Sequence, residues 1–93
     1  MNAAIGAAVA DAARRTGLPV AVLSVISAER VTWADGSLGC PQAGAAYTMA
    51  LVPGHRIRIR AQGQTLDFHS DARGHQVLCP AGRAIEPIPE ARR

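Results

Sequence analysis

The sequence predicts an α+β domain in which one N-terminal helix packs on a small antiparallel sheet of about four strands that ends in a β-meander. Two observations lead to this prediction. Residues 3–16 are rich in alanine and carry apolar side chains at helical spacing, whereas residues 55–79 contain three short strand-like segments separated by turns. A single amphipathic helix must cover an apolar surface, and one face of an antiparallel sheet offers such a surface.

The first element is a helix over residues 3–16, because alanine favours the helical conformation intrinsically. Arg14 and Arg15 fall in its last turn, where cations suit the helix dipole. Gly17 then provides a left-handed cap, and Pro19 prevents the helix from continuing. The residues predicted to face the sheet are Ile5, Val9, Ala12 and Ala13.

The second element is a strand over residues 20–33, which are rich in β-branched side chains. Neither face is polar at first, so the start of the strand is predicted to be buried and its end half-exposed. The alternation slips near Ala28 and Glu29, which predicts a β-bulge there.

An irregular segment over residues 34–54 follows, with turn dipeptides near both ends, such as Pro53-Gly54. A short strand is predicted inside it, over residues 47–52.

The β-meander has a register that its turns define. A two-residue turn joins the first two segments, and a four-residue turn leads to the third. With these turn lengths, one face of the sheet is apolar across all three strands, including Cys79. The predicted cross-strand pairs are Ile57 with Phe68, Ile59 with Leu66, Arg58 with Asp67, Val77 with Phe68 and Cys79 with Leu66.

Length and composition set the limits of the interpretation. The 93 residues suffice for one domain, predicted over residues 1–79, and the remaining residues 80–93 are predicted to form a Pro-rich flexible tail. No apolar run approaches the roughly 18 residues that a membrane-spanning helix needs. The N-terminus lacks the positive and leucine-rich regions of a signal peptide, which predicts a cytoplasmic protein and leaves export of a trimmed precursor open.

The segment Trp33–Pro41, which reads W-A-D-G-S-L-G-C-P, resembles a signature of small bacterial domains of uncharacterised function. In those domains a W-x-D-G-x-L-G segment precedes a tyrosine- or cysteine-containing stretch and a strand that reads Pro or Asp, Gly, then His, Tyr or Trp, then Arg and Ile or Val. They finish with an aromatic residue, His or Arg, and then Ser or Thr with Asp or Asn before a glycine turn. The corresponding parts here are Tyr47-Thr48, Pro53–Ile57 and Phe68–Asp71. The resemblance covers residues 20–79 and implies neither an activity nor a cofactor.

The signature has a structural interpretation and a binding one. Its glycines allow positive φ values, and the Asp35 carboxylate can cap the turn, so a loop that closes one end of the sheet is favoured. The alternative is a recognition loop, because Gly-rich loops on a rigid scaffold often bind partners. The binding residues would then be Trp33, Asp35, Ser37 and Tyr47.

Enzymatic and metal-binding alternatives have weaker support. Cys40 and His55 have the composition of a thiol dyad, but nothing in their spacing enforces it, and proline after the cysteine excludes an activating helix N-terminus. No short ligand pair typical of zinc sites exists among Cys40, His55, His69 and Cys79. We therefore predict no metal and no cofactor, and we favour a non-enzymatic protein.

The strand around Arg58 offers a basic face. Arg56, Arg58 and Arg60 alternate with apolar residues and would line the solvent side of the sheet, where guanidinium groups suit anionic partners. Nucleic acid is disfavoured, because the net charge is only +3 and no aromatic side chain shares this face for base stacking. The sequence thus predicts a module that binds a protein or another anionic macromolecule through residues 33–54 or this arginine face.

The two cysteines are predicted to approach each other. Cys79 ends the third strand of the meander, and Cys40 lies in the loop expected to cap the same sheet. Their Cα atoms should lie within roughly 7 Å, the limit for a disulfide. In a reducing cytoplasm the bridge would be optional, and its formation would argue for export.

Overall fold

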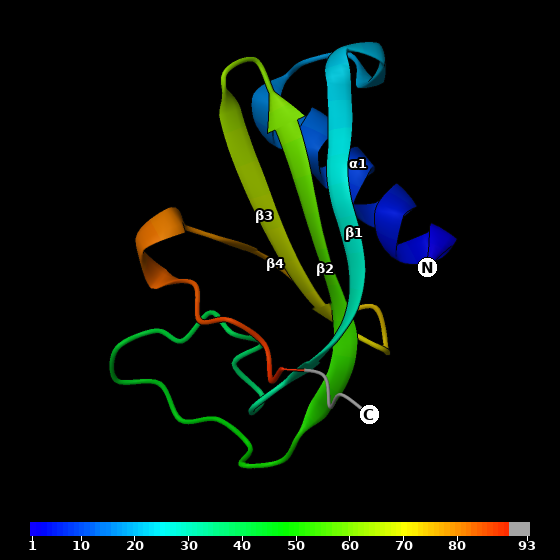
Figure 1. Cartoon of the computed structure of the whole chain (residues 1–93). Coiled ribbons are helices and arrows are strands. Elements are labelled where there is room, and N and C mark those ends of the chain that lie inside the picture. Colours follow the sequence, from blue (N-terminus) through cyan, green and yellow to red (C-terminus); the bar gives the residue numbers. More distant parts are fainter. Residues whose placement is uncertain (90–93) are drawn as a thin grey trace.

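The computed structural model describes residues 1–89 and confirms the predicted α+β fold. Helix α1 lies on one side of a four-stranded antiparallel sheet with the strand order β1-β2-β3-β4 (Figure 1). Two short 3-10 turns occur at Val20–Val22 and Ala81–Arg83. The helix and strands are α1 Asn2–Thr16, β1 Leu23–Trp33, β2 Val52–Ala61, β3 Gln64–Asp71 and β4 Gln76–Cys79.

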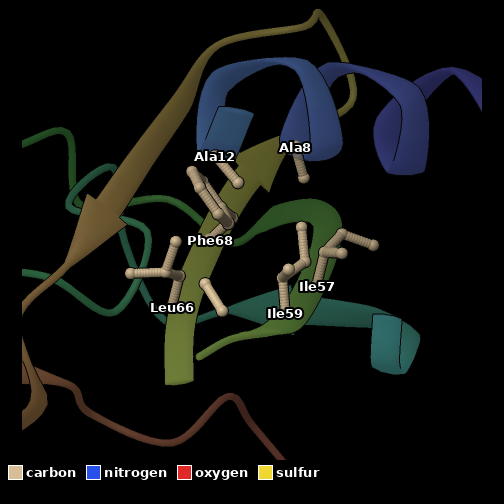
Figure 2. Close-up of a cluster of buried hydrophobic side chains, with 7 residues drawn as sticks. Ala8, Ala12, Ile57, Ile59, Leu66 and Phe68 are labelled. Atoms are coloured by element: carbon tan, nitrogen blue, oxygen red, sulfur yellow. The ribbon is translucent and has the colours of Figure 1, made fainter. Parts of the chain in front are cut away.

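Small residues both end helix α1 and form its buried face. Gly17 adopts the left-handed conformation with φ 72°, and its N–H donates to the Ala13 carbonyl. Ala8 and Ala12 are the fully buried helix residues, which lets the helix approach β2 and β3 closely (Figure 2). The predicted side chains Ile5 and Val9 are partly buried at the border of this core. The sheet contributes Ile57, Ile59, Ala61, Leu66 and Phe68.

The register of the meander is as predicted between β2 and β3, but it is shifted by one residue between β3 and β4. The turn is tighter than expected, because the Asp71 N–H donates to the His75 carbonyl and the Asp71 carboxylate accepts from the Arg73 and His75 N–H groups. Cys79 therefore pairs with Asp67, not with Leu66. This correction moves Cys79 from the helix-facing side of the sheet to its outer face.

Strand β1 also differs from the prediction. It is an edge strand, and its bulge lies between Val25 and Ser27, before the predicted position. Val20, Val22, Val25 and Ile26 are 41–57% exposed, so the expected burial of this stretch is wrong. The reason is topological: no further strand covers the outer edge of β1 in the part of the chain that the structure describes.

The predicted strand at residues 47–52 is wrong as well, since only Val52 belongs to a strand, as the first residue of β2. The expected turn at Pro53-Gly54 lies inside β2. Gly54 is required there by close packing, because a Cβ atom would lie 1.8 Å from the Ser70 carbonyl oxygen.

Candidate functional site

A buried ion-pair cluster occupies the outer face of the sheet, opposite α1. The Arg56 side chain is 5% exposed, and its Nε and Nη2 donate to the Asp67 carboxylate at 3.0 and 2.9 Å. Its Nη1 donates to Glu86 at 2.8 Å. The hydrogen bond with Asp67 raises the pKa of Arg56. Arg56 is therefore an internal side chain, and its predicted exposure to solvent is wrong.

Asp67 is the shared counter-charge of this cluster. Burial raises the pKa of Asp67, but the contacts with His69 and Arg56 outweigh that effect and hold the pKa well below its usual range. The sequence paired Asp67 with Arg58, its direct cross-strand neighbour, and that Cα pairing is confirmed. The ion pair nevertheless forms diagonally, with Arg56.

His69 and Trp33 lie beside this cluster and are fully buried. Their rings stack with centroids 4.5 Å apart, and Trp33 Nε1 donates to the Ser70 carbonyl at 2.9 Å. His69 Nδ1 donates to the Leu38 carbonyl at 2.6 Å. Its Nε2 lies 3.0 Å from Asp67 Oδ2, without good hydrogen-bond alignment. Trp33 therefore packs inside the protein and presents no ring to a partner.

The signature loop folds onto the outer face and covers these rings. The Asp35 carboxylate accepts from both the N–H and the hydroxyl of Ser37, and these hydrogen bonds lower the pKa of Asp35. Gly39 has φ 68°, and a Cβ atom there would lie 2.6 Å from the Trp33 ring. Tyr47 Oη accepts from the Gln42 N–H at 2.9 Å. The polar groups predicted for recognition are thus engaged within the loop.

Cys40 and Cys79 form a disulfide that fixes the loop to β4, with Cα atoms 5.6 Å apart. Both residues are buried. The prediction assumed that they meet on the helix-facing side, whereas they meet on the outer face because of the shifted register. With its sulfur bonded to Cys79, Cys40 has no thiol to offer as a nucleophile. Among residues 1–89, no group of three His, Cys, Asp or Glu side chains could hold a metal ion.

His55 lies apart from Cys40, on the helix-facing side of β2. It borders a groove of about 930 Å³ and a smaller cavity of about 270 Å³, and neither is lined by Cys40. Burial, together with the charges of the N-terminus and Arg30, lowers the pKa of His55. Its buried Nδ1 has no hydrogen-bond partner within the described part of the chain. The structure therefore does not bring the two residues of the predicted dyad together.

Arg58 and Arg60 form the open part of the outer face, beyond the cluster. The Arg58 side chain is 37% exposed, and its nearest acidic group is Glu29 at 3.6 Å, beyond hydrogen-bond distance. Arg60 is exposed and has no ion pair among residues 1–89. Ser27 and Ser24 are their neighbours on β1. Arg60 is consequently open to solvent, and Arg58 is half-exposed with its Nε buried.

Residues 84–89, which we call the strap, follow the 3-10 turn after β4 and lie against the signature loop and β1. The Ile85 N–H donates to the Gly39 carbonyl at 2.8 Å, and the Ile88 N–H donates to the Thr32 carbonyl at 2.9 Å. Glu86 supplies the second carboxylate of Arg56. The predicted tail extended to residue 93, and residues 90–93 lie outside the described residues.

The model of a family described as a domain of unknown function (DUF8738) matches residues 5–79. The chain belongs to this family. The matched region starts in α1, includes the signature loop and ends with the last residue of β4, so the strap lies beyond it. No curated protein and no solved structure matches the chain.

Sequence reasoning missed the cluster of Arg56, Asp67 and Glu86 and the buried His69 beside it. A signal did exist, because β2 and β3 are the central strands of the predicted sheet and carry alternating charged residues on their outer face. Central charges of this kind are often paired when a loop covers them.

No helix in residues 1–89 has the length and apolar character needed to cross a bilayer.

Proposed function

We propose that the domain is a non-enzymatic module that binds an acidic protein segment through Arg58 and Arg60. The observation that carries the proposal is the difference between neighbouring arginines on β2. Arg56 is neutralised by two carboxylates. Arg60, by contrast, is exposed with no ion pair among residues 1–89, and Arg58 has only a 3.6 Å contact with the exposed Glu29. Guanidinium groups suit carboxylates, because their planar donors match both oxygens.

The remaining side chains favour this function over the alternatives. The recognition-loop hypothesis loses support because Trp33 and Ser37 are buried. The thiol-enzyme hypothesis loses its nucleophile while the disulfide is present. Single-stranded nucleic acid is bound by several exposed aromatic rings, whereas Trp33 and Phe68 are fully buried and Tyr47, the third aromatic residue, is half-buried. An acidic protein partner requires only the exposed guanidinium groups.

The test measures binding of a labelled decapeptide of glutamate and serine by fluorescence anisotropy at physiological ionic strength. We expect the variant Arg58→Gln/Arg60→Gln to bind at least about tenfold more weakly than the natural chain, since two charge-assisted contacts are lost. The control is Arg14→Gln/Arg15→Gln, which removes the same charge from exposed side chains of α1. This control should change the affinity by less than about twofold, because it alters only screened long-range attraction.

Two outcomes would overturn the proposal. Equal weakening by both double variants would show that only net charge matters. In a parallel titration with random single-stranded and duplex oligonucleotides, sub-micromolar binding that Arg58→Glu abolishes would identify nucleic acid as the partner.

A further inference from the structure

The strap is attached to the body by three polar contacts and little else. In Figure 1 it is the red segment that passes the end of β1. Its contacts are the Ile85 and Ile88 N–H groups and the Glu86 carboxylate described above. The side chain of Glu86 is 77% exposed, and Ile85 and Ile88 are 55% and 41% exposed. A segment that buries so little apolar surface detaches at low free-energy cost.

The surface beneath the strap presents a carboxylate-binding group. Asp67 satisfies Nε and Nη2 of Arg56, which leaves Nη1 to donate outward. The Arg56 side chain is 5% exposed with the strap in place, so departure of the strap uncovers Nη1 and removes its one acceptor among residues 1–89. A carboxylate suits this position, because a charge-assisted hydrogen bond to a guanidinium group is stronger than one to a neutral acceptor.

The same surface presents a backbone acceptor on a free sheet edge. Strand β1 pairs only with β2, and Ile88 is the one backbone partner of its outer edge between Ser24 and Trp33 in the described chain. An unpaired edge is a template to which an extended peptide can add. Thr32 thus offers its carbonyl to any extended segment that follows the strap's path.

A groove beside the strap leaves room for more than the strap fills. Its volume is about 930 Å³, and its wall includes Leu51, Pro53 and Ile88. Leu51 and Pro53 belong to the body and remain as an apolar surface next to Thr32 when the strap, with Ile88, is displaced. A ligand can therefore place an apolar side chain there in the position of Ile88.

The strap itself shows the spacing that fits these features. A carboxylate residue, Glu86, comes two positions before a residue that supplies a backbone N–H and an apolar side chain, Ile88. Pro87 and Pro89 favour the extended backbone and lack N–H groups at the alternate positions, where none is needed. The recognised pattern is therefore an acidic residue, any residue and an apolar residue in an extended chain.

We infer that the path of the strap is a recognition site for an extended acidic peptide with this spacing, and that the strap is an intramolecular stand-in which the ligand displaces. The inference rests on the proposed function, because it names the class of partner for the same face of the sheet. The binding site would then consist of Arg56 and the edge of β1 together with Arg58 and Arg60.

The test uses a fluorescein-labelled peptide with the sequence of residues 84–89, Ala-Ile-Glu-Pro-Ile-Pro, and the full chain. In the natural chain the tethered strap competes at an effective concentration in the millimolar range, so the peptide should bind weakly. Glu86→Gln weakens this competitor, and the peptide should then bind about tenfold more tightly, since a hydrogen bond to a charged group is lost from the strap. A peptide with glutamine in place of its glutamate should lose about the same factor on the Glu86→Gln chain.

Asp11→Asn is the matched control, because it removes one negative charge from α1, on the opposite side of the sheet. It should leave the peptide affinity at the value of the natural chain. A second measurement needs no substitution: hydrogen exchange at the Ile85 and Ile88 amides should be faster than in β2 and β3, and excess peptide should accelerate it further.

The inference is overturned if the peptide does not bind the Glu86→Gln chain at millimolar concentration, or if the glutamine peptide binds equally well. It is also overturned if the Ile85 and Ile88 amides exchange as slowly as the core. These failures are separable from failure of the proposed function. The strap peptide could bind as expected while Arg58→Gln/Arg60→Gln leaves the affinity for the decapeptide unchanged. That result would support the strap site and contradict the function assigned to Arg58 and Arg60.

Discussion

The two faces of the sheet are held by different kinds of interaction. On the helix-facing side, α1 covers alternate apolar residues of β2 and β3, and no specific hydrogen bond or ion pair links the side chains of this core in the described chain. On the outer face, the chain closes on itself through Trp33–Ser70, Leu38–His69 and Arg56–Glu86, whose members are 37, 31 and 30 residues apart. One face is thus an apolar core whose residues the local alternation marks, and the other is a polar core held by specific hydrogen bonds and ion pairs.

The largest expected effect tests the apolar face. Phe68 is fully buried against α1, and Phe68→Ala should reduce the free energy of unfolding by roughly 3–5 kcal/mol, because it removes packing and leaves a cavity. Val77→Ala on the neighbouring strand is the control, since Val77 is 39% exposed on the outer face. Its cost should stay below about 1 kcal/mol. Urea unfolding measures both, and equal losses would contradict the contrast between the two faces.

The next effect tests the covalent closure of the outer face. Removing the bridge with Cys40→Ser/Cys79→Ser should cost roughly 2–4 kcal/mol, because the disulfide restricts the unfolded chain over a separation of 39 residues. A reductant should destabilise the natural chain by a similar amount and leave the double variant unchanged. If the reductant leaves the unfolding curve of the natural chain unchanged, the stabilising role of the disulfide is contradicted. Mass spectrometry of alkylated protein from the native cell would test the expected cytoplasmic location, since a complete bridge argues for export.

The smallest effect concerns acid and the polar core. Because the folded pKa of Asp67 lies below its usual value, its stabilising contribution is complete above the pKa of an unfolded aspartate, about 3.9, and is lost as the pH falls through the folded pKa. Between pH 4 and pH 2 the natural chain should lose roughly 1–2 kcal/mol more stability than Asp67→Asn, which has no proton to gain there.

Urea unfolding at several pH values checks this difference. The contributions of the other carboxyl groups to the pH dependence cancel in the comparison, because both proteins retain them. Asp67→Asn should already be less stable than the natural chain at pH 7, because Arg56 loses a buried partner. Parallel pH profiles of the two proteins would show that Asp67 does not hold the polar core together.

The errors of the sequence prediction have one local cause, at the turn before β4, and two causes that depend on segments distant in the chain. The one-residue shift of β4 came from the Asp71 side chain, which tightened the turn in a way that loop length alone does not reveal. The exposed start of β1 came from its edge position, since a run of β-branched residues is the same whether or not a further strand covers it. The location of Arg56 depended on the return of Glu86, thirty residues later in the chain.

By itself, the sequence determined the elements and the apolar core: the helix and its Gly17 cap, the pairing of β2 with β3 and the side of the sheet that α1 covers. These features follow from local periodicity and turn chemistry, which act over a few residues. Only the tertiary structure decided that the outer face is also covered, that Arg56 is internal and that Arg58 and Arg60 remain open. The physical reason is that a charged side chain on a strand has the same local pattern in water and in a paired cluster, and the difference depends on which distant segment folds over it.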